Sequence, residues 1–404
     1  MLIVTLDGFT PSALSCFGSS WNRTPAIDAM AMGGTTWDRT VCHQLDPSIR
    51  FTDWLSKWRL SPDQVSFVTD DGSIASLDAA NAFSEIVLID EPIESVAATM
   101  EETRLAQLFA VAMASADTSN CVWIHSRFLL EAWDAPRTLF AIETFHDLDD
   151  AEPGFVDEDQ ESGVSTADAD WQPMPPWFDE MTPPQLAIDE HSHPDLLATW
   201  MRTYGCQIRL VDELIGVASR WAQGERGDVV VLAGGRGFAL GQKGFIGGQS
   251  AEGSSLLSVP VIASVGTGLR VPHLTGLDSF PSILDLAARF DGSLTGSNAD
   301  VAMAQRFPSL DEHPTSDGPE SWAEPTTDAP WVLAMEGLTP VGLHTPEWFF
   351  QPGADALYLK PDDVHDINNV ARLRPEEVSR FRDYCNQFAT DGNEASDRGD
   401  EGWL

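Results

Sequence analysis

The chain of 404 residues is poor in basic side chains, with 23 Lys and Arg against 63 Asp and Glu and a formal net charge of −40. A field of this sign repels nucleic acids and anionic membrane surfaces, so we expect neither as a partner. Composition alone leaves open whether the charge reflects a saline habitat or a function.

Cysteine is also scarce, and no apolar run approaches the roughly 20 residues of a membrane span. The cysteines are odd in number, widely spaced and without a CxxC pair, which predicts neither a disulfide framework nor a zinc knuckle. The opening "MLIVTL" is typical of a strand and not of a signal peptide. We therefore expect a cytoplasmic protein with reduced thiols. The five cysteines are Cys16, Cys42, Cys121, Cys206 and Cys385.

Several short apolar segments bounded by turn residues are typical of interior strands. Because they are apolar throughout and alternate with helical segments, they favour a largely parallel sheet covered on both faces, which is an α/β fold. The segments are 2–6, 84–89, 121–126, 228–233 and 259–264.

The clearest helix is predicted over about 194–223, where apolar residues recur at spacings of three and four. Composition changes further along the chain divide it into regions. We expect a large α/β domain over 1–295 with an acidic insertion at about 137–193, a linker over 296–330, a small C-terminal subdomain over 331–390 with a helix from about 375 to 388, and a polar tail over 391–404.

The first 41 residues carry a dense set of motifs: Asp7 directly after the first strand, "CFG" from Cys16, and "TPAIDAMAMGGTTW" from Thr24. These motifs resemble the start of sulfatases of the alkaline-phosphatase superfamily. Later segments follow in that family's order, among them "YGCQIRLVDELIGVASRW", "SVPVIASVGTG" and "LTGLDSFPSILDLAA". The resemblance implies an alkaline-phosphatase-like fold, with a large, mostly parallel sheet, helices on both faces and a small C-terminal α+β subdomain.

The resemblance also implies a divalent cation, calcium or magnesium, held by carboxylates after the first strand and by an acidic pair before an "HG" motif. Asp7 retains the first of these positions, and Gly8 follows it. In "GGRGFALGQKG", Gly235 and Arg236 stand where the family has Asp and His. Since a hard cation usually needs several oxygen ligands, one retained carboxylate is too few, and we expect no cofactor.

The family's nucleophile is a cysteine or serine of "CxPSR" that is oxidised to formylglycine. The corresponding segment is "CHQLDPSIRF", which puts Leu45 at the nucleophile and Ile49 at the arginine, with Arg50 one place late. Neither Leu45 nor Asp46 can become formylglycine. Asp46 is either an aspartate nucleophile or the N-cap of a helix whose first residue is Pro47, and we favour the cap.

Three further sets of polar residues are weaker candidates. His125, on the apolar strand "CVWIHS", is either a catalytic acid or a core residue. Lys243 lies near a family histidine position, where it would contact an anion or remain on the surface. His191 and His193 form an HxH pair within acidic sequence, which is either a metal site or a solvated loop. For each we favour the structural interpretation.

Together these losses predict a sulfatase-like pseudoenzyme with a binding or regulatory role toward a small molecule or a protein. A buried, unpaired Asp7 would be costly, so we predict that Arg236 replaces the cation by pairing with it.

Two alternatives stay open. One is an active hydrolase of sulfate or phosphate esters that uses Asp7 and Asp46 with an altered metal or none. The other is a sugar-binding module built on tryptophan faces. Its candidate residues are Trp37, Trp54, Trp133 and Trp348.

Overall fold

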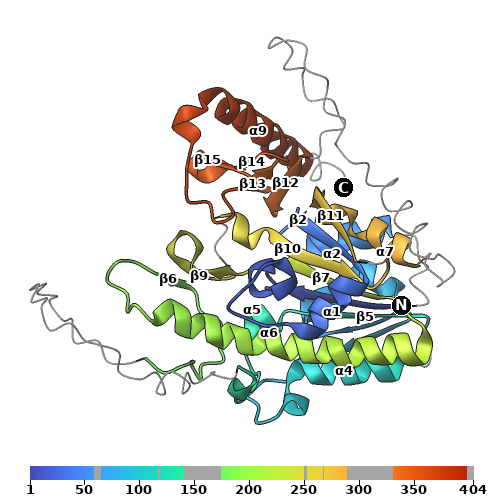
Figure 1. Ribbon diagram of the computed structural model, residues 1–404. Coiled ribbons are helices and arrows are strands. Elements are labelled where there is room, and N and C mark those ends of the chain that lie inside the picture. Colours follow the sequence, from blue (N-terminus) through green and yellow to red (C-terminus); the bar gives the residue numbers. More distant parts are fainter. Residues whose placement is uncertain are drawn as a thin grey trace, which may run out of the picture.

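The largest element is an eight-stranded sheet with the order β11-β2-β10-β7-β1-β5-β3-β4 (Figure 1). All neighbouring pairs are parallel except those of β10, which runs antiparallel to β2 and β7. The strands are β1 (Leu2–Asp7), β2 (Thr35–Val41), β3 (Val65–Thr69), β4 (Glu85–Leu88), β5 (Cys121–Ser126), β7 (Val230–Arg236), β10 (Ser258–Ala263) and β11 (Leu269–Gly276). The computed structural model describes residues 1–58, 65–116, 119–140, 174–249, 253–266, 268–288 and 331–397.

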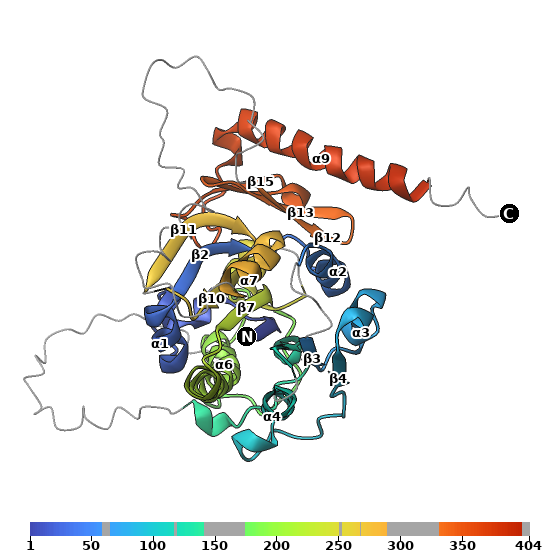
Figure 2. The ribbon, with the colours of Figure 1, turned by 90° about the vertical axis from the view of Figure 1, so that its right-hand side faces the viewer.

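The predicted α/β fold is confirmed, and each of the five predicted segments corresponds to a strand of this sheet. The segment 84–89 was expected to be an interior strand, but it forms β4, a partly exposed strand at the edge of the sheet. Helices cover both faces (Figure 2). One face packs against α1 (Pro25–Gly33), α4 (Arg104–Ser115) and α6 (Leu196–Trp221), and the other against α2 (Pro47–Lys57), α3 (Gly72–Ala75) and α7 (Phe280–Ala288).

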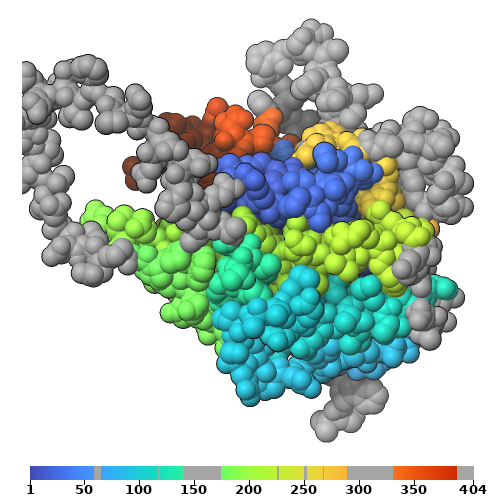
Figure 3. All heavy atoms as spheres, turned by 60° about the horizontal axis from the view of Figure 1, so that its bottom comes forward, coloured from blue at the N-terminus to red at the C-terminus, as the bar shows by residue number. Residues whose placement is uncertain are grey.

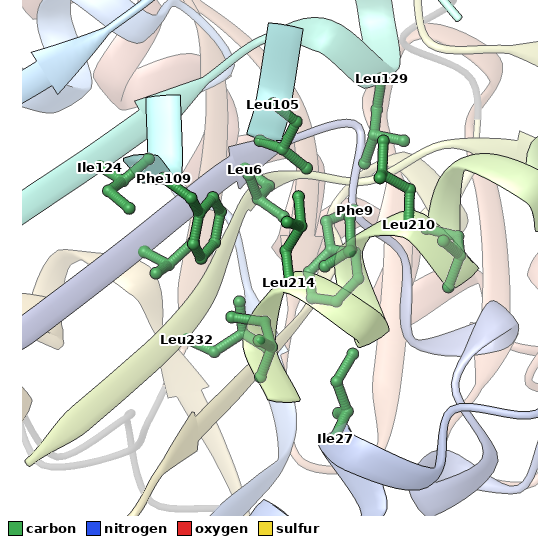
Figure 4. Packing of buried hydrophobic residues seen from close by; sticks show 14 of the residues in the cluster. Leu6, Phe9, Ile27, Leu105, Phe109, Ile124, Leu129, Leu210, Leu214 and Leu232 are labelled. Carbon is green, nitrogen blue, oxygen red and sulfur yellow. The ribbon is translucent and has the colours of Figure 1, made fainter. Parts of the chain in front are cut away.

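The core on the α6 side is a continuous apolar cluster. Leu6 and Phe9, at the end of β1 and just after it, meet Ile27 of α1 and Leu214 of α6 (Figure 4). Seen from below in Figure 3, α6 (yellow-green) lies between the blue N-terminal residues and the cyan segment around α4. The helix predicted over 194–223 is thus α6. Its apolar stripe holds the sheet and two neighbouring helices together.

A separate antiparallel sheet forms the C-terminal part of the fold, as the resemblance implied. Its core includes Leu343 and Phe350 of the sheet and Phe381 of the helix packed on it. The strands are β12 (Val332–Glu336), β13 (Thr339–His344), β14 (Trp348–Gln351) and β15 (Ala356–Leu359), and the helix is α9 (Pro375–Asp397). Figure 1 shows this sheet above β2, β10 and β11.

The remaining elements are short. They are α5 (Phe128–Glu131) and a small sheet of β6 (Leu186–Ala187), β8 (Ala239–Leu240) and β9 (Phe245–Gly247). Helix α9 continues beyond the predicted end at 388 and into the predicted tail. The predicted linker, most of the acidic insertion and the last seven residues lie outside the described ranges. Within those ranges, no helix combines the length and apolar character that a membrane crossing needs.

Candidate functional site

Three chain segments meet at the ends of β1 and β7. We call this end of the sheet its carboxyl edge. β1 ends at Asp7 and β7 at Arg236, and these two residues are paired across the strands. The backbone N–H of Gly8 donates to the carbonyl oxygen of Arg236 at 2.8 Å. β2 lies in the same sheet and leads into α2, so the sheet topology brings all the predicted active-site segments together.

Asp7 is paired with Arg50, and their side chains are 1% and 0% exposed. Arg50 Nη2 donates to Asp7 Oδ1 at 2.5 Å, and Nη1 donates to the carbonyl oxygen of Gln44 at 3.0 Å. The guanidinium also lies 5.5 Å from the ring centre of Trp54. The predicted direct pairing of Asp7 with Arg236 is therefore wrong, because the guanidinium bonded to Asp7 is that of Arg50. The other carboxylate oxygen, Asp7 Oδ2, has no hydrogen-bond partner among the described residues.

Helix α2 brings Arg50 to this position. Asp46 Oδ1 accepts hydrogen bonds from the backbone N–H groups of Ser48 and Ile49, at 2.9 and 3.3 Å, and Pro47 is the first helical residue. The predicted N-cap is thus observed. Arg50 then lies on the buried side of the helix, where its guanidinium contacts Asp7 at the end of β1. A helical projection of "DPSIRFTDW" would have placed Arg50 on the same side as the buried Trp54.

Gly235 makes room for this pair. A Cβ atom built on Gly235 would overlap Asp7 Oδ1 and lie 2.7 Å from Arg50 Nη2. A carboxylate side chain at position 235 is therefore incompatible with the pair as it stands. The buried pair therefore needs both the arginine at position 50 of α2 and the absence of a side chain at position 235.

Arg236 adds a second positive charge at the carboxyl edge. Its Nε and Nη2 atoms are buried and have no hydrogen-bond partner among the described residues. Burial lowers the pKa of Arg236, while the negative charges of Asp7 and Glu336 act in the opposite direction. Arg236 therefore interacts with Asp7 through space, without a direct hydrogen bond to the carboxylate.

The residues at the carboxyl edge do not fit a divalent cation. Asp7 Oδ1 is bonded to a guanidinium, the expected second carboxylate is Gly235, and the third position carries another cation. Leu45, at the expected nucleophile, is an apolar residue packed in the core. No group of three or more His, Cys, Asp or Glu side chains that could hold a metal occurs in the described part of the chain.

A hairpin of the C-terminal sheet covers the segment before α2. The backbone N–H of Leu45 donates to Met335 O at 2.8 Å, and that of Met335 donates to His43 O at 2.9 Å. The Gln44 side chain bonds both backbone groups of Gly337, in the turn between β12 and β13. Gln44 O in turn accepts from Arg50, so these contacts connect the hairpin to the Asp7–Arg50 pair.

The two other weak candidates lie in structural contacts. His125 is buried; its Nδ1 is 3.0 Å from Thr5 Oγ1 and its Nε2 is 3.9 Å from Asp71 Oδ2. Lys243 Nζ donates to Gln351 Oε1 at 2.6 Å and to the Tyr358 hydroxyl at 2.9 Å. Lys243 thus joins the turn after β8 to the C-terminal sheet.

The histidine pair lies on an exposed loop. The His191 side chain is 84% exposed, with Nε2 3.7 Å from a Glu190 carboxylate oxygen. His193 Nδ1 accepts a hydrogen bond from the backbone of Asp195 at 3.0 Å. These contacts suit a solvated turn.

Most of the tryptophans proposed as a sugar platform are in the core. Trp37, Trp54 and Trp133 are at most 1% exposed, so the predicted stacking surface is wrong for them. Trp348 is half-buried, with the Arg374 guanidinium 5.9 Å from its ring centre.

No protein-family model and no curated protein matches the chain. Solved structures match it over almost its whole length. BT4656, in complex with its substrate D-glucosamine-2-N,6-O-disulfate, is 13% identical, with a TM-score of 0.59 and coverage of 97% of this chain and 98% of that one. A phosphonate monoester hydrolase of Agrobacterium radiobacter is 13% identical, with a TM-score of 0.57 and coverage of 96% and 94%.

BT1596, a 2-O GAG sulfatase, is 12% identical, with a TM-score of 0.58 and coverage of 98% and 93%. The chain therefore has the alkaline-phosphatase-like fold of sulfatases and phosphonate monoester hydrolases, as its motifs predicted.

Proposed function

We propose that this protein uses the sulfatase fold for binding or regulation and does not hydrolyse sulfate esters. The buried Asp7–Arg50 pair carries the proposal, since it puts a guanidinium beside the carboxylate where the resemblance implies a metal ion.

A guanidinium neutralises Asp7 but does not replace a metal in catalysis. A divalent cation polarises the oxygens of a bound ester and orients the nucleophile. Arg50 uses Nη1 on Gln44 and Nη2 on Asp7, and it is fully buried, so little of it remains for a substrate. The pair therefore supports a structural role for the charges at the carboxyl edge.

The candidate nucleophiles support the same conclusion. Leu45 has no nucleophilic atom, and Asp46 Oδ1 accepts the two N-terminal hydrogen bonds of α2. A carboxylate oxygen engaged by two donors is a weaker nucleophile, because attack would require those bonds to be given up.

The test is an assay of the purified full chain with aryl sulfate and aryl phosphate esters, after chelation and with calcium, magnesium, manganese or zinc added back. We expect no turnover above buffer in any condition. Turnover that is lost in both Asp7→Asn and Asp46→Ala would establish the alternative, an active ester hydrolase with an atypical site.

Thermal unfolding of the same samples gives an independent measurement. A ligand of the native state raises the free energy of unfolding by mass action, by about 2.7 kcal/mol at a hundred times its Kd, and the melting temperature rises with it. We expect no shift with any of the four cations. A shift that disappears in Asp7→Asn would show that Asp7 binds a metal after all.

A further inference from the structure

Strand β4 is the last strand at one edge of the main sheet, and it is short, from Glu85 to Leu88. It runs parallel to β3, and Figure 2 shows it at the rim of the sheet beside α3. Among the described strands, none pairs with its outer side. An edge strand of this kind presents unpaired backbone groups and can accept a further strand.

The backbone groups on the outer side of β4 are those of Ile86 and Leu88. The backbone N–H of Ile89 donates to the carbonyl oxygen of Thr69, at the end of β3, at 2.9 Å. Because the backbone groups of successive strand residues point alternately to either side, Val87 also faces β3, whereas Ile86 and Leu88 face outward. The Leu88 side chain is 38% exposed, so this edge offers both hydrogen-bonding groups and apolar surface.

Acidic side chains flank this edge at both ends. Glu85 is exposed at the start of β4, and Asp90 and Glu91 are exposed just after its end. Together with the net charge of −40, these carboxylates disfavour pairing with a second copy of this chain, which would bring like charges together. The same charges favour a cationic partner.

A hollow of about 320 Å³ lies just beyond the carboxyl end of β4, between the segment from Glu91 and the start of α4. Four carboxylates line it against one cation, Arg104; the four are Glu91, Glu94, Glu102 and Asp134. Glu91 and Glu94 are exposed and form no ion pair within the described ranges, so both are available to a partner. A lysine or arginine side chain forms its strongest hydrogen bonds with carboxylates of this kind.

We propose that β4 and this hollow form one interaction surface, which binds an extended basic segment of a partner protein. The segment adds a ninth strand to the sheet through the backbone groups of Ile86 and Leu88, and a lysine or arginine beyond that strand pairs with Glu91 or Glu94. Main-chain hydrogen bonds supply affinity, and charge selects the partner. This surface shares no residue with the Asp7–Arg50 pair, so the proposal goes beyond the proposed function and does not depend on it.

The probe is a fluorescently labelled peptide of ten residues in which Lys and Val alternate, and its binding to the full chain is measured by fluorescence anisotropy. Two matched peptides separate backbone pairing from charge. In one, Glu replaces every Lys; in the other, the charges are kept and the backbone nitrogens are methylated. We expect both to bind at least tenfold more weakly than the probe. Absence of probe binding, or equal binding of the methylated peptide, would overturn the proposal, since net charge alone would then explain any attraction.

Two double variants locate the binding surface. Glu91→Gln/Glu94→Gln should weaken probe binding at least fivefold. Glu376→Gln/Asp383→Asn removes the same formal charge from exposed positions of α9 and should change the affinity less than twofold. Equal weakening by the two double variants would contradict the surface.

Hydrogen exchange followed by mass spectrometry reports on the backbone itself. Bound probe should slow exchange of the backbone amides in residues 85–89, because the outward N–H groups of β4 gain acceptors. Unchanged exchange there at saturating probe would overturn the added strand. None of these measurements involves ester hydrolysis, so failure here is distinguishable from failure of the proposed function.

Discussion

The Asp7 carboxylate and the Arg50 guanidinium meet through a 2.5 Å hydrogen bond between two fully buried side chains. Such a pair contributes little net stability relative to a well-packed apolar pair, because both charges have lost their hydration. Removing one partner alone strongly destabilises the fold, since the remaining charge stays buried without compensation.

Arg50→Met should therefore destabilise the protein by about 3–5 kcal/mol in urea unfolding followed by circular dichroism. The double variant Asp7→Asn/Arg50→Met should recover part of this loss, because it removes the uncompensated charge. Arg382→Met, at an exposed pair, is the control and should have no measurable effect. A single Arg50→Met variant as stable as the wild type would contradict the buried pair.

Gly235→Ala should destabilise the protein by about 1–3 kcal/mol, the usual cost of overpacking a buried site. The new Cβ atom would overlap Asp7 Oδ1, and both Asp7 and Arg50 are fixed by their own contacts. Gly353→Ala is the matched control, since nothing lies within 4 Å of a Cβ there. Equal melting temperatures for the two variants would show that the pair has room to move.

Asp46→Ala should cost about 1 kcal/mol, because two backbone N–H groups at the start of α2 would lose their acceptor. Asp46→Ser, which keeps a capping oxygen, should retain most of the stability. If Asp46→Ser were as destabilised as Asp46→Ala in chemical unfolding, capping would not be the role of this residue.

His344 should make stability depend on pH. Its pKa is lowered from 6.5 to about 3 in the folded protein, mainly by burial. Between these values the unfolded chain binds the extra proton, so stability falls as pH falls, by up to ~1.4 kcal/mol per pH unit from this group. His344→Leu should flatten the curve between about pH 6 and 4, while His191→Gln, at an exposed histidine, should not. Parallel curves for wild type and His344→Leu would contradict the buried, neutral imidazole.

The sequence was sufficient to predict five of the eight strands of the main sheet and the helix α6. Strands such as 121–126 are mostly apolar and buried along their whole length, and α6 has a continuous apolar stripe, so local pattern and burial agree. The N-cap at Asp46 was also predictable, because "DPS" combines a capping side chain with a proline at the first helical position.

The partner of Asp7 could not be read from strand alignment. The sequence motif led to Arg236, which is adjacent to Asp7 across the strands, but the charge nearest the carboxylate comes from α2.

The hairpin contact at Gln44 also has a consequence for the order of folding. Gln44 and Gly337 are 293 positions apart, so this edge of the sheet is completed only after nearly the whole chain has been synthesised. Contacts of such long range form late and slow the folding of a domain. During synthesis, the segment from Cys42 to Asp46 therefore stays without its contacts to Met335 and Gly337 until the C-terminal hairpin has been made.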